Sequence, residues 1–172
     1  IIRMEWTYLN NSGITRRIDE LGRIVVPKEL RNNLGIRDGE PLLIYTNDDS
    51  IIIKKYSKLE KYEDKINKYA NIIKEFIDDD LIITDREKVI FSTSNDFEIN
   101  KKIDNKLIKL IDNRESYLKN ELDSFMGIGG YYKIIPIISE SDSLGLIILY
   151  SKDNKYDYLN YIKVLSNLIS SC

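Results

Sequence analysis

The chain has 172 residues, of which 42% are hydrophobic and 31% are charged, and its formal net charge is -2. This balance is typical of a soluble globular protein, and no run approaches the roughly 18 uninterrupted apolar residues of a membrane-spanning helix. Histidine is absent and Cys172 is the single cysteine. These facts exclude histidine-based catalysis, most zinc sites and an internal disulfide. We therefore expect no catalytic residue, metal, cofactor or membrane partner, and a cytoplasmic location.

Residues 1–12 are interpreted as a tail, and residues 13–56 predict short strands around one helix. Residues 14–18 alternate between apolar and polar side chains, and residues 23–26 are rich in β-branched side chains, so both segments predict strands. Pro27 ends the second strand and suits the first turn of a helix. A brief helix is then expected over residues 28–34, with Gly35 closing its carboxyl end.

Residues 41–46 and 50–55 predict a hairpin that turns at residues 47–49. The whole segment 13–56 has only about 45 residues, a size at which a lone unit buries too little apolar surface without a disulfide, a metal or a partner. With no cysteine or histidine to supply the first two, we expect this domain to dimerise.

Residues 57–78 are expected to form a linker or interface helix. Its apolar residues are spaced alternately by three and four, which gives nearly three heptads. They are Leu59, Tyr62, Ile66, Tyr69, Ile73 and Phe76. Two interpretations stay open: the helix joins subunits or relays a signal, or it is an amphipathic helix that packs on the sheet of its own domain.

Residues 79–172 predict a second domain. Strands are expected over residues 81–85, 89–92, 131–139 and 144–150, with one helix near residues 103–111 and a closing helix near residues 158–169. Adjacent strands with tight turns indicate an antiparallel sheet with helices on one side, an α+β sandwich.

The segment 13–31 reads GITRRIDELGRIVVPKELR, and it closely resembles the AbrB-type swapped-hairpin DNA-binding domain; residues 34–36 and 52–56 continue the match. The layout of the second domain resembles a GAF domain. The resemblance implies an α+β protein in which two chains interleave hairpins into one β-barrel dimer, followed by a GAF-like α/β sandwich with an antiparallel sheet.

The resemblance also implies which residues contact DNA. The arginines of the family that contact DNA match Arg16, Arg23 and Arg31, with Arg17 and Lys28 as helpers. Asn32, included among the contacts, stands where relatives often carry a second arginine. Since no recognition helix of convincing length is predicted, we expect arginine contacts and DNA shape to set the preference.

Charge alone supports a different interpretation of these arginines. Residues 1–57 hold nine Lys and Arg against eight Asp and Glu, a net of +1, and residues 58–172 hold seventeen against twenty, a net of -3. An excess this small is also compatible with a solvated surface on which the arginines pair with Asp19, Glu20 and Glu29.

Other segments give weaker signals. Residues 127–130 are glycine-rich but lack the spacing of a phosphate loop, so we expect a flexible loop at the border of a pocket. Phe91, Phe125 and Tyr132 are candidates for lining a small-ligand site there, with ordinary core packing as the alternative. The acidic run 78–80 is interpreted as a solvated helix end.

The resulting hypothesis is a transcription regulator that binds duplex DNA as a dimer, or as a tetramer held by the linker helix and the second domain. The resemblance implies a regulator that activates and represses genes late in sporulation, in the forespore. Two alternatives remain: an antitoxin of the MazE type, which shares the swapped-hairpin fold and grips its toxin with a largely disordered tail, and a sensor of an unknown small-molecule effector in which DNA binding is secondary.

Overall fold

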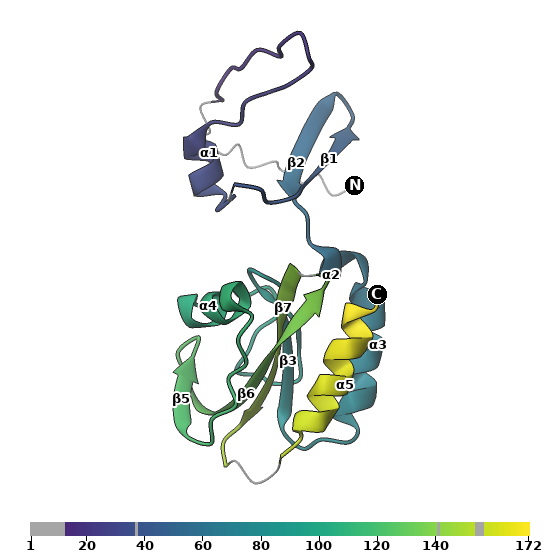
Figure 1. Cartoon of the computed structure of the whole chain (residues 1–172), viewed down its shortest axis with the longest axis vertical. Coiled ribbons are helices and arrows are strands. Elements are labelled where there is room, and N and C mark those ends of the chain that lie inside the picture. The colour runs from purple at the N-terminus through teal and green to yellow at the C-terminus, as the bar shows by residue number, and fades with distance from the viewer. Residues whose placement is uncertain (1–12, 37, 141, 154–156) are drawn as a thin grey trace, which may run out of the picture. The chain divides into compact units, whose positions relative to one another are not determined.

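The computed structural model describes residues 13–36, 38–140, 142–153 and 157–172, so the predicted tail at residues 1–12 lies outside the described residues. The chain divides into two compact units, Ile1–Tyr56 and Ser57–Cys172. Figure 1 shows the helices and strands of both.

The first unit contains the predicted short helix and hairpin. Helix α1 spans Lys28–Asn33 and follows Pro27. It ends in a Schellman motif, in which Gly35 at φ 63° donates to the carbonyl of Asn32 (3.1 Å) and Ile36 donates to the carbonyl of Arg31 (2.7 Å). A positive φ at this position favours glycine because a side chain would clash there. The sequence-based prediction of both helix ends is confirmed.

Strands β1 (Leu42–Asn47) and β2 (Ser50–Lys55) pair antiparallel, with Asn47 opposite Ser50, so the turn has two residues. The strands predicted over residues 14–18 and 23–26 are absent from the described first unit. Both segments lack the ladder hydrogen bonds that define a strand, because no strand among the described residues of this chain pairs with them. Their prediction is wrong for the single chain.

The second unit begins with two helices where one was predicted. Helix α2 spans Lys58–Lys61 and α3 spans Glu63–Lys74, and the break falls at Tyr62, whose φ of -112° and ψ of 19° are not helical. The apolar seam of this segment packs within the second unit: Leu59, Ile66 and Ile73 are buried in one of its cores. Of the two interpretations left open by the heptad spacing, packing on the domain's own sheet describes these three residues.

A five-stranded sheet forms the centre of the second unit, and each neighbouring pair of its strands is antiparallel. The strand order is β4-β3-β7-β6-β5. The strands are β3 (Asp80–Thr84), β4 (Val89–Ser92), β5 (Leu122–Phe125), β6 (Ile128–Ser139) and β7 (Asp142–Ser151). The antiparallel sheet was predicted, and β5 is an additional edge strand.

Helices cover both faces of this sheet, so the prediction of helices on one side is wrong. Helices α3 and α5 (Leu159–Ser170) pack on one face, and α4 (Asn105–Asn113) packs on the other (Figure 1). The reason lies in strand β3, where Leu81, Ile82 and Ile83 are all 0% exposed. Successive strand residues point to opposite faces, so an unbroken apolar run requires a cover on each.

The glycine-rich segment 127–130 forms a tight hairpin, which corrects the prediction of a flexible loop. Phe125 pairs with Ile128, so Met126 and Gly127 make a two-residue turn with φ values of 53° and 81°. Two successive positive φ values are typical of the type I′ turn, which matches the twist of the flanking strands. Gly129 and Gly130 lie within β6.

Candidate nucleic-acid interface

A tight turn built on Asp19 presents Arg23, one of the predicted DNA contacts. The Asp19 Oδ1 atom accepts hydrogen bonds from the backbone amides of Leu21 (3.0 Å) and Arg23 (2.8 Å), and Oδ2 accepts one from Arg23 Nε (2.7 Å). Gly22 completes the turn at φ 75°. The backbone amide of Arg23, followed by its guanidinium, holds the pKa of Asp19 below its ordinary value, so the carboxylate is ionised at neutral pH.

Three further predicted contacts are exposed cations without ion pairs. Arg16, Arg17 and Lys28 are exposed, and none has a hydrogen-bonded or charged side-chain partner among the described residues. The alternative in which these arginines are neutralised by neighbouring carboxylates therefore applies to Arg23, which pairs with Asp19, but not to these three. Unpaired exposed cations are available to phosphate groups.

Helix α1 carries the remaining two predicted contacts. Asn32 is exposed, whereas the Arg31 side chain is 34% exposed and pairs through Nη1 with Asp38. The Arg31 Nε atom is buried without a hydrogen-bond partner in the described structure. Arg31 must therefore exchange its Asp38 partner for a phosphate or a base edge before both terminal nitrogens can bind DNA.

The apolar side chains of the first unit have no core in the single chain. No residue that the structure describes between positions 13 and 56 is buried. The exposed large apolar side chains of this range are Ile14, Ile18, Leu21, Ile24, Val25, Leu30, Leu34, Leu43, Ile44, Tyr45, Ile51, Ile53 and Tyr56. So many exposed apolar groups on so small a unit are typical of a surface that another chain covers.

The three residues predicted to line a ligand site do not share one space. Phe91 is buried in the core under α3 and α5, whereas Phe125 and Tyr132 are buried in the core under α4, with ring centroids 4.8 Å apart. Tyr132 donates its hydroxyl to the carbonyl of Ile128 (2.5 Å), and burial raises its pKa. The structure describes all three as core residues.

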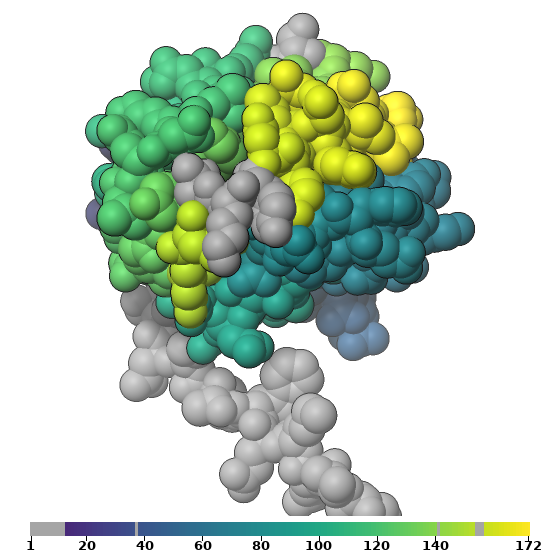
Figure 2. Space-filling view, turned by 90° about the horizontal axis from the view of Figure 1, so that it is seen from below, coloured from purple at the N-terminus to yellow at the C-terminus, as the bar shows by residue number. Residues whose placement is uncertain are grey.

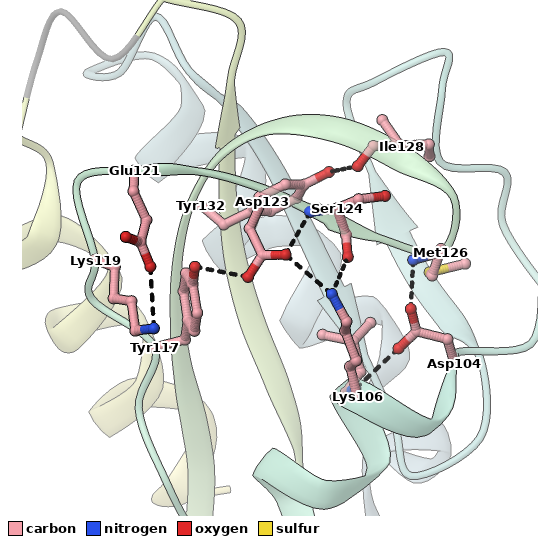
Figure 3. Close-up of polar contacts among 11 residues, drawn as sticks. Asp104, Lys106, Tyr117, Lys119, Glu121, Asp123, Ser124, Met126, Ile128 and Tyr132 are labelled. Carbon is pink, nitrogen blue, oxygen red and sulfur yellow. Dashed lines mark hydrogen bonds and ion pairs between the residues drawn. The ribbon is translucent and has the colours of Figure 1, made fainter.

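A polar cluster that sequence reasoning missed joins α4 to the β5–β6 hairpin (Figure 3). The Asp123 carboxylate accepts hydrogen bonds from Lys106 Nζ (2.9 Å), the Tyr117 hydroxyl (2.7 Å) and the amide of Ser124 (2.7 Å). These donors, the ammonium group first, lower the pKa of Asp123 to about 2. Two of them lie 6 and 17 residues away in sequence, so no local pattern marks the cluster.

Within the residues that the structure describes, no group of three or more acidic, cysteine or histidine side chains is arranged to hold a metal ion. In the same part of the chain, no helix has the length and apolar character needed to cross a membrane.

Residues 59–171 match the family described as "Stage V sporulation protein T C-terminal, transcription factor", and residues 15–61 match "Antidote-toxin recognition MazE, bacterial antitoxin". Two Bacillus subtilis proteins are similar. Stage V sporulation protein T is 36% identical over 83% of this chain and 85% of its own length, and transition state regulatory protein AbrB is 37% identical over 60% and 98%. The solution structure of the N-domain of the transcription factor abrB is 50% identical over 29% of this chain and 96% of that chain, with a TM-score of 0.27.

These matches define the chain as a transcription regulator with an AbrB-type first domain. The chain belongs to the stage V sporulation protein T family.

Proposed function

We propose that this transcription regulator binds duplex DNA through its first unit, with Arg16, Arg17, Arg23, Lys28, Arg31 and Asn32 as the contacts. The observation that carries the proposal is the set of exposed, unpaired cations at Arg16, Arg17 and Lys28. A fragment of AbrB that is 51% identical over 28% of this chain is called the "N-terminal DNA Recognition Domain" of that regulator, which supports extending the same role to this unit.

The test is a salt series of duplex binding with the triple variant Arg16→Ala/Arg23→Ala/Arg31→Ala. In a dimer this variant removes six cations, so the slope of log K against log salt should flatten by about 5 and most of the affinity should be lost. A matched control replaces Lys101, Lys102 and Lys109 by alanine; these exposed lysines of the second unit lie outside α3 and α5 and have no ion pair among the described residues. Equal losses in both variants, or no change in either slope, would exclude the proposed contacts.

The DNA-binding unit is proposed to be an interleaved dimer. Two copies that exchanged hairpins would cover the apolar residues of the first unit. They would also supply ladder partners for residues 14–18 and 23–26, which have none among the described residues of the single chain. A dimer also doubles each cation and so matches a two-fold DNA site.

Dimers are further proposed to pair into homotetramers through α3 and α5, which lie side by side on the surface of the second unit (Figure 2). Large apolar side chains remain exposed along this face: Ile72, Phe76, Tyr161, Val164 and Leu168. Phe76 and Tyr161 stack with ring centroids 6.1 Å apart, so the patch is continuous across the two helical segments. A second copy would bury this patch, and two linked DNA-binding dimers would gain avidity for spaced sites.

Light scattering tests the tetramer with the variant Phe76→Lys/Val164→Lys. The mass of the particle should fall from four chains to two, because the patch then carries four charges per pair of copies. The control is Ile99→Lys, at a position that is as exposed as Phe76 (57% each) but lies in the loop after β4. An unchanged mass for the double variant would contradict this interface.

The biological role is proposed from the relative's name, which places that protein in sporulation. We infer that this chain activates and represses forespore genes in the cytoplasm of the developing spore. The second unit is proposed to act as a GAF-like regulatory domain that responds to a small-molecule effector, which thermal-shift screening with nucleotides and amino acids would identify.

The antitoxin alternative has one supporting observation, the MazE-type match over residues 15–61. It expects a largely disordered tail, whereas the second unit has two apolar cores on a five-stranded sheet. Hydrogen exchange separates the two functions: strong protection of β3, β6 and β7 supports a folded regulatory domain, and fast exchange throughout residues 57–172 supports an antitoxin tail.

A further inference from the structure

The two oxygens of Asp19 have different roles in the turn that carries Arg23. Oδ1 accepts only backbone amides, those of Leu21 and Arg23, and so forms the turn. Oδ2 accepts from Arg23 Nε at 2.7 Å. One carboxylate therefore builds the backbone of the turn and also holds the arginine side chain that projects from it.

The way in which Arg23 is held leaves its outer edge open. Nε is the inner nitrogen of the guanidinium, and its bond to Asp19 leaves Nη1 and Nη2 without a partner among the described residues. The Arg23 side chain is 71% exposed. The two terminal nitrogens form the edge that binds two phosphate oxygens, or the O6 and N7 atoms of guanine, in a bidentate manner.

We propose that Asp19 is a positioning residue for DNA binding: it orients the guanidinium of Arg23 so that the Nη1–Nη2 edge faces the duplex. The inference rests on the proposed function, in which Arg23 contacts DNA. A free arginine side chain loses rotamer freedom when it binds, and an arginine already held in one orientation loses less.

The proposal makes a prediction opposite in sign to simple electrostatics. A carboxylate close to DNA repels phosphates, so charge alone predicts tighter binding when Asp19 loses its charge. Positioning predicts weaker binding. The sign of the change therefore separates the two effects without any need to compare small magnitudes.

The test compares Asp19→Asn with Glu20→Gln in duplex-binding titrations at fixed salt. The asparagine amide oxygen still accepts the two backbone amides of the turn, but its NH2 group cannot accept from Arg23 Nε. We expect Asp19→Asn to weaken binding by about tenfold, the upper end of the cost of ordering one long side chain on binding. Glu20 is exposed, and its side chain has no hydrogen-bonded or charged partner among the described residues, so Glu20→Gln should leave affinity unchanged or raise it slightly.

A double-mutant cycle with Arg23→Ala shows whether Asp19 acts through Arg23. Asp19→Asn should have no further effect on binding in the Arg23→Ala background, because the side chain it orients is gone. Thermal unfolding midpoints of wild type and Asp19→Asn should agree, since the turn is retained. Asp19→Ser, whose hydroxyl also accepts turn amides, provides a second variant and should weaken binding to a similar extent.

Three results would overturn the inference: tighter binding by Asp19→Asn, a loss equal to that of Glu20→Gln, or a tenfold loss that persists in the Arg23→Ala background. Wild-type chain that fails to bind any duplex would instead remove the proposed function, and this inference with it. The two failures are therefore distinguishable in the first titration.

Discussion

Gly145 is a residue at which the second unit has no room for a side chain. A Cβ atom at this position would lie 1.9 Å from the carbonyl oxygen of Thr84, the last residue of the neighbouring strand β3, and 2.9 Å from the Cα atom of Asp85, which follows it. Both atoms belong to the backbone, so neither can rotate away. The glycine here permits close approach of two strands rather than a special turn.

Gly145→Ala should therefore destabilise the second unit by about 3 kcal/mol or more, the upper end of what overpacking costs. Gly129 provides the control, because it also lies in a strand and a Cβ atom added there would meet nothing within 4 Å. Gly129→Ala should be neutral or stabilise by up to about 1 kcal/mol. Urea unfolding measures both changes, and similar midpoints for the two variants would contradict the close approach.

Asp123 should make the stability of the second unit depend on pH. Its pKa is lowered from 3.8 to about 2, so the ionised carboxylate stabilises the fold above the ordinary value, and this contribution is lost as pH falls from about 4 to about 2. Buried Asp85 acts in the opposite direction, since burial raises its pKa and its protonation favours the folded state. Comparison of variants isolates Asp123 because Asp85 is common to all of them.

Asp123→Asn should thus unfold at lower urea than wild type at pH 7, and the two midpoints should converge as pH approaches 2. Asp142→Asn serves as the control, because this exposed carboxylate has no side-chain partner in the described structure. Its midpoint should follow that of wild type across the same pH range. If the difference in urea midpoint between Asp123→Asn and wild type stayed constant with pH, the charge of the carboxylate would not contribute to the stability of the cluster.

At the scale of elements, α3 has one face buried against the sheet and another that carries the proposed tetramer contact. Ile66 is 1% exposed and lies in the core, and Ile72 is 45% exposed. The residues at the heptad spacing therefore face mainly the core of their own domain. The exposed apolar residues of this segment are Ile72, which lies outside the heptad spacing, and Phe76, which belongs to it.

Ile66→Ala should destabilise the second unit by about 2–5 kcal/mol, the range for deletion of a buried aliphatic side chain, and should leave the oligomeric mass unchanged. Lys68→Ala, an exposed change on the same helix, should shift stability by no more than about 0.5 kcal/mol. Urea unfolding and light scattering on the same samples provide both readouts. If Ile66→Ala lowered the oligomeric mass without lowering the stability of the second unit, the residues at the heptad spacing would belong to the subunit interface instead.

Elements with strong local signals were predictable from the sequence. Pro27 and Gly35 bound α1, and the β-branched runs gave β1, β2, β3, β4, β6 and β7. The proposed DNA-contact residues were predicted through resemblance, because the small charge excess of residues 1–57 taken alone favours an ion-paired surface. Asp19 was named as a possible ion-pair partner of these arginines, but the use of Nε of Arg23 in that pair depends on the geometry of the folded turn.

The wrong predictions share one physical cause: contacts between elements distant in sequence, rather than local pattern, determine these features. The break at Tyr62 lies inside an unbroken helical periodicity, so the sequence pattern gives no sign of it. Edge strand β5 contains Leu122, which is 68% exposed, so this strand lacks the buried apolar pattern that predicts a strand. The apolar run of β3 indicates that helices cover both faces of the sheet, but the prediction placed the helices on one face only. Residues 14–18 and 23–26 have strand patterns, but no strand among the described residues pairs with them.

At the scale of the whole molecule, the two units differ in what they need to fold. The second unit has two apolar cores formed from its own residues, whereas the described part of the first unit has no buried residue. Hydrogen exchange at several protein concentrations should therefore show protection of β1 and β2 that falls on dilution, because folding is then linked to association. Protection of β3 and β7 should persist at every concentration. Dilution-independent protection in β1 and β2 would mean that the first unit folds as a monomer.

The lack of buried residues in the described part of the first unit has a consequence for gene control. If the first unit folds only as a dimer, then at low protein concentration the number of folded DNA-binding dimers grows with the square of the number of chains. Halving the supply would leave about a quarter of them, by simple mass action. Promoters served by such a regulator would switch over a narrower range of protein level than promoters read by a self-sufficient monomer.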